Sequence, residues 1–455
     1  MNYSEIITKQ RNYFNTNQTK DIDFRIGQLK KLKNLIKQQE ASFYKAIHQD
    51  FGKSEFETYT AELSFIYDEI NTSIKKLPKW AKRKRNKTNL VNLPARSYTI
   101  AEPLGVCLVI GAWNYPYQLS LVPLITAMAA GNTVILKPSE IPSATSAVMT
   151  DLINTNFPTE YVHVIEGGIP ETTTLLKEKF DKIFFTGSTT VGKIVYQAAA
   201  KHLTPVTLEL GGKSPAIVSK DTNISETAKR IIWAKFLNAG QTCIAPDYIL
   251  VEESIKKELL EAFKVQIEKY EYAYENDNYV QIINDKNFTR LTNLIDRKKL
   301  FTGGESNAEK RFIAPTILSD VTFDHAIMKD EIFGPILPVI SYTDLDEIIK
   351  KIKSRPKPLS LYIFTKTKEI KTKIVHEISF GGGAINDAVM HITNSHLAFG
   401  GVGSSGMGNY HGEAGFKDFS HSKGILEKPF GLEPNFKYAP YTNSKLSWIK
   451  KIMGN

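Results

Sequence analysis

The segment Lys182–Gly192, with the sequence KIFFTGSTTVG, sets the pattern on which the fold of this chain is built. Its apolar beginning is followed by a turn that starts at Gly187 and opens a stretch of helical composition extending to Lys201. A strand that passes through a tight turn into a helix presents backbone N–H groups and the positive end of the helix dipole to an anionic group such as a pyrophosphate. Gly187, Ser188 and Gly192 are therefore candidate residues of a phosphate-binding turn.

Short apolar runs alternate with helix-like stretches along most of the chain. About 80 residues of amphipathic helical pattern and an extended stretch at residues 89–102 come first. Two series of apolar runs follow, at residues 106–110, 133–136, 161–165 and 182–185, and then at 216–218, 249–251, 338–340, 361–364 and 383–386. Such alternation is typical of parallel α/β sheets, which bind ligands at the carboxyl ends of their strands. The sequence thus predicts two α/β units.

Length and composition indicate a large globular protein of two or three domains. The chain has 455 residues, of which 42% are hydrophobic. It has no apolar run of about 18 residues, the length that a membrane span needs. Its start, MNYSE, has neither the basic cluster nor the apolar stretch of a secretion signal. Because it has only two cysteines, a disulfide scaffold is not expected, and the expected location is the cytoplasm.

The chain is basic, with a formal net charge of +10. Its densest basic run extends from Lys75 to Lys87 and is not accompanied by a nucleic-acid-binding signature. A solvated linker is the favoured interpretation of this run, and attraction to an anionic surface or an acidic partner is the alternative. No nucleic-acid partner and no metal site are expected.

A thiol and a carboxylate lie on separate glycine-containing turns. Cys243 ends the stretch NAGQTC, and Glu209 lies in LELGGK. A thiol that forms a thioester and a carboxylate that activates water against it are the two groups that a covalent acyl-transfer mechanism needs. Asn114, in AWNYP, offers a side-chain amide to an oxyanion. The other cysteine, Cys107, lies in an apolar run and is expected to be a core residue.

These motifs occur together in the order found in one enzyme family. With KPSE at residues 137–140, EIFGP at 331–335 and GSSGMG at 403–408, the chain resembles the NAD(P)-dependent aldehyde dehydrogenases from about residue 20 to about residue 430. The sequence QTCIAPDY at residues 241–248 and a start without a longer amino-terminal extension are similar to the class 3 branch. The resemblance implies an α/β fold of the aldehyde dehydrogenase type, with a Rossmann-type cofactor domain, an α/β catalytic domain and a small β oligomerisation element.

The resemblance also implies where these domains begin and end, and it implies a homodimer. The NAD(P)-binding domain would comprise residues 1–82 and 102–208, the catalytic domain residues 209–414, the oligomerisation element residues 83–101 and 415–432, and a tail residues 433–455. The tail places Leu446, Ile449, Ile452 and Met453 near one helical face beside lysines. A frayed terminus or a dimer contact is the favoured interpretation of this face. The alternative is weak contact with a membrane surface, which would make the protein peripheral to the membrane.

Residues of the cofactor site are assigned by the resemblance. Lys137 and Glu140 would contact the hydroxyls of the adenosine ribose, Ser188 the pyrophosphate, and Glu331 the nicotinamide ribose. The complete expected set is Trp113, Lys137, Glu140, Gly187, Ser188, Gly192, Glu331 and Phe333. A carboxylate at the ribose 2′-hydroxyl disfavours the phosphate of NADP, whereas Lys137 favours it, so NAD is expected and NADP stays open. The alternative for Lys137 and Glu140 is a surface ion pair.

The literal nucleotide-binding pattern GxGxxG occurs elsewhere, at Gly401, Gly403 and Gly406. It is followed by Asn409–Gly412, which is not a strong helix former, so the strand–turn–helix context of a dinucleotide site is missing. A mobile loop near the substrate mouth, as the resemblance suggests, is the favoured interpretation.

The expected reaction is the oxidation of an aldehyde to a carboxylic acid. The Cys243 sulfur adds to the aldehyde carbon, the Asn114 amide and the Cys243 backbone N–H stabilise the oxyanion, and Glu209 activates the water that hydrolyses the thioester. In purely structural roles, Asn114 would form a turn, and Glu209 would accept hydrogen bonds from the Gly211–Gly212 turn. The alternatives for the whole chain are a coenzyme-A-acylating dehydrogenase, which would not need Glu209 as a base, and a non-catalytic basic binding protein.

Three aromatic residues flank the catalytic motifs, Tyr115, Trp233 and Phe399. They would line an apolar pocket for aliphatic, aromatic or long-chain polyene aldehydes. Core packing explains each of these side chains equally well.

Overall fold

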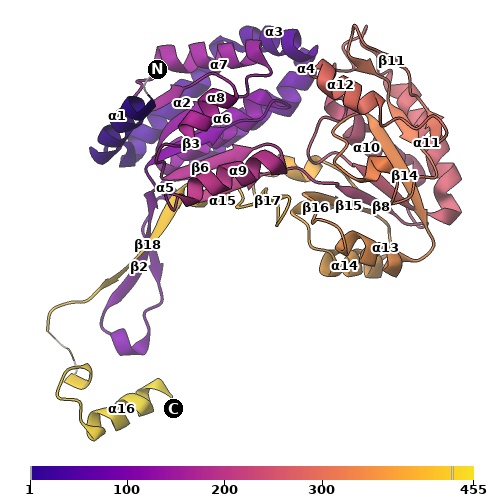
Figure 1. Cartoon of the computed structure of the whole chain (residues 1–455). Coiled ribbons are helices and arrows are strands. Elements are labelled where there is room, and N and C mark those ends of the chain that lie inside the picture. Colours follow the sequence, from indigo (N-terminus) through magenta and orange to yellow (C-terminus); the bar gives the residue numbers. More distant parts are fainter. Residues whose placement is uncertain (1–2, 432, 434, 455) are drawn as a thin grey trace.

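Two α/β halves lie side by side and form the body of the molecule, and an extended arm projects from the first half (Figure 1). The computed structural model describes residues 3–431, 433 and 435–454. Residues 1, 432 and 455, at which expected domains begin or end, therefore lie outside the described residues. Residue 434, within the expected tail, also lies outside them. In the described part of the chain, no helix is both long and apolar enough to cross a membrane.

The first half is built on a six-stranded sheet in the order β17-β7-β6-β3-β4-β5. Five strands are parallel, and the short edge strand β17 is antiparallel to β7. The strands are β3 (Val106–Ile110), β4 (Thr133–Lys137), β5 (Val162–Val164), β6 (Lys182–Thr186), β7 (Val206–Glu209) and β17 (Gly406–Met407). Apolar side chains from both faces of the sheet are buried, which is why the strands read as continuous apolar runs. The four runs expected in this half are confirmed as β3, β4, β5 and β6.

Helix α6 lies at the centre of the first half. It covers Pro116–Ala130, and because all of its residues are buried it lacks the polar face of a surface helix. Pro116 at its first position and Gly131 in a left-handed conformation (φ 95°) set its limits. The helices around it are α1 (Tyr3–Asn15), α2 (Ile22–Gln38), α3 (Glu40–Phe51), α4 (Glu55–Thr58), α5 (Ser64–Trp80), α7 (Ser143–Asn156), α8 (Ile169–Leu175) and α9 (Thr189–Ala200). The amphipathic helices expected in the first 80 residues are thus confirmed.

The second half contains a seven-stranded sheet in the order β10-β13-β14-β9-β8-β15-β16, parallel except for β10. Its strands are β8 (Pro215–Val218), β9 (Tyr248–Glu252), β10 (Leu300–Thr302), β13 (Thr316–Leu318), β14 (Ile336–Tyr342), β15 (Ser360–Phe364) and β16 (Gly382–Ile385). It also contains the helices α10 (Ile224–Phe236), α11 (Lys256–Tyr270), α12 (Asp285–Thr292), α13 (Leu345–Lys353) and α14 (Lys368–Glu377), and the short pair β11 (Ser306–Asn307) and β12 (Phe312–Ile313). The five expected runs are strands. Sequence reasoning missed β10 and β13, because runs of 3 residues are too short to show a period.

The chain passes from the first half to the second after β7 and returns to the first half at β17. Strand β17 comes from residues expected in the catalytic domain, yet its Gly406 pairs with Glu209 of β7. The GxGxxG pattern therefore supplies an edge strand of the first sheet. Short 3-10 segments connect other elements: η1 (Gln18–Lys20), η3 (Leu90–Asn92), η4 (Leu237–Gly240), η5 (Glu253–Ile255), η6 (Ala326–Met328), η7 (Met390–Thr393) and η8 (Asn435–Lys437). A π-helical turn, η2 (Tyr59–Leu63), joins α4 to α5.

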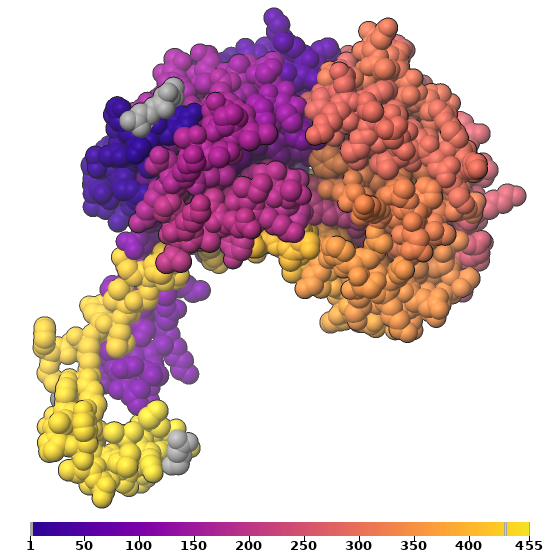
Figure 2. Space-filling model, in the orientation of Figure 1, coloured from indigo at the N-terminus to yellow at the C-terminus, as the bar shows by residue number. Residues whose placement is uncertain are grey.

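The arm is a three-stranded antiparallel sheet that stands clear of the body (Figures 1 and 2). Its strands are β1 (Lys84–Asn86), β2 (Arg96–Pro103) and β18 (Ser420–Glu427), and α16 (Asn443–Met453) lies at its far end. The second segment of the expected β oligomerisation element, residues 415–432, begins in a helix instead of a strand, because Gly412–Asp418 forms α15. Helix α15 packs so closely on α6 that a Cβ on Gly415 would approach Thr126 Cγ2 to 2.6 Å.

One buried amide fixes the arm to the first half. Asn132 accepts a hydrogen bond from the Gly105 N–H (2.9 Å) and donates to the carbonyls of Ala127 (3.1 Å) and Phe419 (3.0 Å). We expect Asn132→Ala to lower the free energy of unfolding by about 2–3 kcal/mol, because three backbone groups lose a buried partner. Denaturant unfolding followed by circular dichroism measures the change. Asn443→Ala, at an exposed position of α16, is the control, and an equally small effect of both substitutions would contradict this role of Asn132.

Candidate active site

Cys243 lies on a loop with an unusual backbone conformation. The loop follows α10, and three consecutive residues in it have positive φ angles: Asn238 (53°), Ala239 (50°) and Gly240 (72°). Only glycine fits at position 240, because a Cβ there would lie 2.3 Å from the Gly334 carbonyl oxygen. The left-handed region is unfavourable for Asn238 and Ala239 by roughly 1 kcal/mol each or more, so surrounding contacts must hold the loop in this shape. Strain of this kind concentrates at functional sites.

The thiol of Cys243 is half-buried in an acidic environment. Burial raises the pKa of the thiol, and the neighbouring carboxylates of Glu331 and Glu209 raise it further. Cys107 differs, because it lies in β3 and is completely buried, as expected for a core residue. Cys243 is therefore the cysteine that a small molecule can reach, and its surroundings favour the neutral thiol.

Asn114 and Tyr115 precede α6 and join the first half to the nucleophile loop. The Asn114 side chain is 3% exposed, and its Nδ2 donates a hydrogen bond to the Gln241 carbonyl at 3.0 Å. The Tyr115 hydroxyl lies 2.6 Å from Thr242 Oγ1. Two hydrogen bonds thus connect the AWNYP turn to the two residues before Cys243. The Asn114 amide therefore lies beside the loop that carries Cys243.

Glu209 is the last residue of β7 and lies in the same electrostatic environment as Cys243. It is 3% exposed, and neither of its carboxylate oxygens has a hydrogen-bond partner among the described groups. Thr186 of β6 lies opposite Glu209 in the pairing of β6 with β7. Its buried hydroxyl also has no hydrogen-bond partner among the described groups. Burial raises the pKa of Glu209 well above its usual range, and Asp418 adds to the effect. The alternative role of Glu209 was to accept hydrogen bonds from the Gly211–Gly212 turn. The Gly212 N–H donates to Glu331 and not to Glu209.

The phosphate-binding turn has the expected strand–turn–helix form. Ser188 caps α9, and its hydroxyl accepts a hydrogen bond from the Val191 N–H at 3.3 Å. Gly192 allows α9 to approach the sheet, since a Cβ would lie 2.6 Å from Leu210 Cδ2. The Thr189 hydroxyl donates to the Ser404 carbonyl at 3.2 Å, which brings the glycine-rich loop 401–406 against the first turn of α9. That loop contacts the cofactor half directly, a position that its sequence did not reveal.

Lys137 and Glu140 lie at the carboxyl end of β4, which β3 separates from β6 and its phosphate-binding turn in the same sheet. Lys137 is buried, its Nζ donates to the Pro138 carbonyl at 2.9 Å, and it lies 3.4 Å from Glu140 Oε2. Burial lowers the pKa of Lys137, and Glu140 opposes this shift. Glu140 is 46% exposed. One buried donor and one accessible carboxylate at a strand end are suited to the hydroxyls of a ribose.

Glu331 and Phe333 come from the second half and face the first. A Cβ on Gly211 would lie 2.0 Å from Glu331 Oε2, so only glycine fits beside this carboxylate. Burial, together with Asp247, raises the pKa of Glu331 to about 8. Phe333 has a φ angle of 50°, and its ring lies edge-on to Trp113 at 5.3 Å. The structure therefore brings these residues of the predicted cofactor set together from opposite halves.

A cavity of about 330 Å³ lies between α9 and Glu331. Its lining includes Thr189 and Lys193 of α9, Gly211, Lys213, Glu331, Lys357 and Ser404. Basic side chains and a helix amino terminus suit phosphates, and a carboxylate suits ribose hydroxyls, so this lining fits a dinucleotide. Sequence reasoning missed Lys193, Lys357 and Ser404. The spacing of Lys193 from Thr189 on one helix face was a usable signal, whereas Lys357 and Ser404 arrive from distant parts of the chain.

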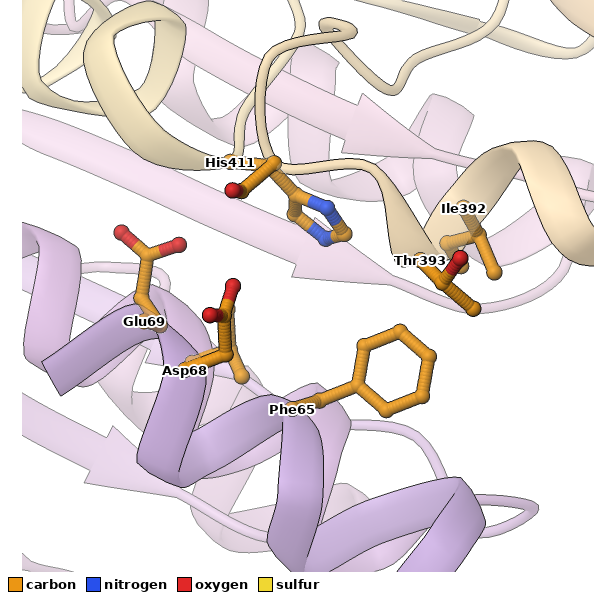
Figure 3. Close-up of a pocket in the computed structure, with 8 residues that line it drawn as sticks. Phe65, Asp68, Glu69, Ile392, Thr393 and His411 are labelled. Atoms are coloured by element: carbon orange, nitrogen blue, oxygen red, sulfur yellow. The ribbon is translucent and has the colours of Figure 1, made fainter. Parts of the chain in front are cut away.

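The three aromatic residues expected in a substrate pocket have different positions. Tyr115 lies beside the nucleophile loop, and Trp233, in the last turn of α10, is 37% exposed. Phe399 is buried and stacks on His411 at 5.7 Å. His411 in turn faces a cavity of about 20 Å³, lined among others by Phe65, Asp68, Glu69, Ile392 and Thr393 (Figure 3). This cavity is large enough for about one water molecule.

Some buried polar groups around the site carry no signal in the sequence. The Gln241 amide donates to the carbonyls of Asn238 (3.1 Å) and Gln281 (3.0 Å), and its oxygen accepts from the Ile283 N–H (3.0 Å). The Tyr410 hydroxyl is buried without a partner among the described groups, and its ring packs on Phe184 of β6 at 4.9 Å. Gln281, Ile283 and Phe184 are far from these two residues in the sequence, so only the folded chain reveals the contacts with them.

Known proteins share this architecture. Residues 1–425 match the aldehyde dehydrogenase family. The chain is 48% identical over 447 residues, 97% of each protein, to the 4,4'-diaponeurosporen-aldehyde dehydrogenase of Staphylococcus aureus (strain NCTC 8325 / PS 47). It is 46% identical over 427 residues, 93% of this chain and 94% of the relative, to the dimeric NADP-preferring aldehyde dehydrogenase of Mus musculus.

A solved structure of Staphylococcus aureus AldH in a substrate-bound state is 47% identical to this chain. The similarity covers 100% of both chains with a TM-score of 0.97, which confirms the expected fold. Proteins named as members of family 3 also match over almost the whole chain, in agreement with the class 3 expectation. The chain therefore belongs to the aldehyde dehydrogenase family.

Proposed function

We propose that this protein oxidises apolar aldehydes to carboxylic acids with NAD or NADP. The observation that carries the proposal is the convergence of three groups. Cys243 and Glu209 lie in one electrostatic environment, and the Asn114 amide is hydrogen-bonded to the same loop that carries Cys243. The cavity that fits a dinucleotide opens beside Glu331, which also faces Cys243.

The reaction begins at the sulfur of Cys243. The Cys243 thiol loses its proton to solvent, its sulfur adds to the aldehyde carbon, and the electron pair of the C=O bond moves to the oxygen, which becomes an oxyanion. The side-chain amide of Asn114 and the backbone N–H of Cys243 stabilise this oxyanion, and losing one such donor typically lowers the rate by about 100-fold to 1,000-fold. The nicotinamide of a bound NAD or NADP supplies the acceptor for the hydride that leaves the carbon. Loss of the hydride leaves a thioester on Cys243.

Glu209 resolves the thioester. It takes a proton from a water molecule as the water oxygen attacks the acyl carbon. The C–S bond then breaks, Cys243 leaves as a thiolate, and the product is the carboxylic acid. A pKa raised by burial suits this role, because a general base acts best when its pKa lies near the working pH. A buried carboxylate beside the sulfur supports hydrolysis rather than transfer of the acyl group to coenzyme A.

The proposal leaves room for either cofactor. By resemblance, Lys137 and Glu140 hold the adenosine ribose, Ser188 and the Gly187–Gly192 turn hold the pyrophosphate, and Glu331 holds the nicotinamide ribose. The accessible Glu140 carboxylate disfavours the 2′-phosphate of NADP, and the adjacent Lys137 ammonium favours it. The mouse relative is named as NADP-preferring and as dimeric.

The proposed substrate is an apolar aldehyde, aliphatic, aromatic or polyene. The Staphylococcus aureus relative is named for a diaponeurosporen aldehyde. Tyr115, Trp233 and Phe399 remain the proposed apolar lining. Residues 209–414 remain the proposed catalytic domain, with 1–82 and 102–208 as the cofactor domain.

We also propose that two copies of the chain associate through the arm, residues 83–101 and 415–432. The arm carries exposed apolar side chains that the body does not cover, including Leu90, Leu93, Leu426 and Phe430. The tail helix α16 exposes Trp448 between lysines. A second copy is the favoured partner of this helix, and weak contact with an anionic membrane surface is the alternative.

Replacement of the nucleophile tests the central step. Cys243→Ser should abolish aldehyde-dependent formation of NADH, because a serine hydroxyl is a much weaker nucleophile than a cysteine thiol. NADH absorbance at 340 nm measures the reaction, and protein fluorescence measures NADH binding, which should be unchanged. Turnover near that of the native protein would disprove covalent catalysis by Cys243. Cys107→Ser is the matched control.

Replacement of the base separates the two half-reactions. Glu209→Gln should slow thioester hydrolysis by about 100-fold or more while hydride loss continues, because only hydrolysis needs the base. Mixing the variant with aldehyde and NAD in a stopped-flow instrument should give a burst of NADH followed by a slow steady rate. If both phases slow equally, Glu209 does not have this role.

The charges around Cys243 predict a pH effect. Glu331 has a pKa of about 8, so its carboxylate is ionised at pH 9 and there raises the pKa of the Cys243 thiol. Glu331→Gln removes this charge, lowers the thiol pKa and should accelerate alkylation of Cys243 by iodoacetamide at pH 9 by about threefold to tenfold. At pH 6 the native carboxyl is largely protonated, so the two proteins should differ little. Equal rates at pH 9 would contradict the assigned coupling.

A further inference from the structure

A short segment of the amino-terminal part of the chain lies directly behind the nucleophile loop. It runs from Lys53, after the end of α3, through α4 to Glu62 in the π-helical turn η2. Lys53 and Glu62 are completely buried, and Glu57 is half-buried. Single π-helical turns are rare and occur often at functional sites.

Glu57 holds the beginning of the nucleophile loop. Its Oε1 accepts a hydrogen bond from the backbone N–H of Asn238 at 3.1 Å. Asn238 is the first of the three consecutive residues with positive φ angles that lead to Cys243. A conformation that is locally unfavourable persists only if its surroundings fix it, and Glu57 provides one of the fixing contacts.

Lys53 and Glu62 hold the turn that carries the oxyanion-binding amide. Lys53 Nζ lies 2.8 Å from Glu62 Oε1 and 3.4 Å from the carbonyl oxygen of Asn114. The other Glu62 oxygen accepts hydrogen bonds from the N–H groups of Tyr117 (2.8 Å) and Gln118 (3.3 Å), in the first turn of α6. The ion pair therefore contacts the Asn114 carbonyl within the turn and the backbone N–H groups that follow the turn.

Asn238 joins the two sets of contacts. Its Nδ2 donates to the Asn114 carbonyl at 2.9 Å and to the Gln241 carbonyl at 3.1 Å. The Asn114 amide donates to the same Gln241 carbonyl. The nucleophile loop and the Asn114 turn are thus tied to each other and to a common support, which consists of Lys53, Glu57 and Glu62.

We propose that Lys53, Glu57 and Glu62 are positioning residues that fix the Asn114 amide relative to the sulfur of Cys243. The proposal rests on the proposed function, because it assigns to Asn114 the oxyanion that forms at Cys243. Burial of the Lys53–Glu62 pair is not needed for packing alone, since apolar residues of similar volume often replace such a pair without loss of stability. Its hydrogen bonds go instead to backbone groups around the Asn114 turn.

Two substitutions of Glu57 separate positioning from folding. Glu57→Gln keeps an oxygen acceptor for the Asn238 N–H, whereas Glu57→Met has similar length and no acceptor. We expect Glu57→Met to lower the rate of the NADH burst by about tenfold or more, because displacements of about 1 Å at a reacting centre have effects up to about 100-fold. Glu57→Gln should retain most of the burst rate. The KM for NAD should stay within about twofold of the native value in both, since Glu57 does not line the cofactor cavity.

Glu55→Gln is the matched control, because Glu55 is an exposed acid of the same helix. Thermal unfolding of every variant shows how much of the protein is folded under the assay conditions. A Glu57→Met protein that is folded and keeps the native burst rate would overturn the proposal. Equal slowing of the burst in Glu57→Gln and Glu57→Met would also overturn it, because the hydrogen-bond acceptor would then be irrelevant.

A second variant covers the case in which Glu57→Met does not fold. Asn238→Gly removes two side-chain hydrogen bonds, but it relieves the strain of a positive φ angle, and both carbonyls keep another donor, so it should remain folded with somewhat lower stability. We expect its burst rate to fall by about tenfold or more, with the KM for NAD unchanged. A native burst rate in this variant would contradict the proposal.

Iodoacetamide distinguishes failure of this inference from failure of the proposed function. The rate of alkylation at Cys243, mapped by mass spectrometry with Cys107 as internal reference, reports the position of the loop without any substrate. If the native protein forms no NADH from a panel of aldehydes, the proposed function fails. A changed alkylation rate in Asn238→Gly would then still support positioning of the loop, and an unchanged rate would contradict it.

Discussion

The hydrogen bond from the Asn114 amide to the Gln241 carbonyl joins the two halves of the molecule at the point where the site is built. Asn114 follows a strand of the first sheet, and Gln241 precedes Cys243 in the second half. Neither half contains a complete site. Buried hydrogen bonds hold the two turns together and so fix the Asn114 amide relative to the loop that carries Cys243. A buried donor or acceptor without a partner is costly, so these bonds also make the relative position of the halves specific.

The site is acidic although the chain is basic. The charges of Glu209 and Glu331 act on the Cys243 thiol, and burial raises the pKa of all three groups. In this arrangement each group favours its neutral form until a substrate, a cofactor or a change of pH alters the balance. The basic side chains lie elsewhere, at the cavity beside α9, where Lys193, Lys213 and Lys357 face the place expected for phosphates. The net charge of the chain therefore does not indicate the chemistry of the site. That chemistry depends on which charged groups lie near Cys243 and which line the cavity beside α9.

Two glycine-containing patterns show how local context controls interpretation. The turn at Gly187–Gly192 follows a buried strand and opens a helix, and the structure places it as expected. The literal GxGxxG pattern lacks that context, and it forms the edge strand β17 and a loop against α9. The sequence predicted that this pattern is not a second strand–turn–helix turn, but it did not show that the loop would add an edge strand to the first sheet or bring Ser404 to the cavity beside α9. A pairing between Gly406 and Glu209 depends on the return of the chain from the second half, and no local pattern encodes such a return.

The amino-acid sequence by itself determined most of the elements and indicated the candidate catalytic groups. Apolar runs with helical stretches between them specified the parallel sheets, and Cys243, Glu209 and Asn114 were identifiable because thiol, carboxylate and amide occur in distinctive short motifs. The tertiary structure alone decided the left-handed conformation of Asn238 and Ala239, the buried support formed by Lys53, Glu57 and Glu62, and the packing of Gly412–Asp418 as a helix. The physical reason is the range of the interactions. Periodicity and turn chemistry act between neighbours in sequence, whereas buried polar contacts join residues far apart in the chain and exist only after it has folded.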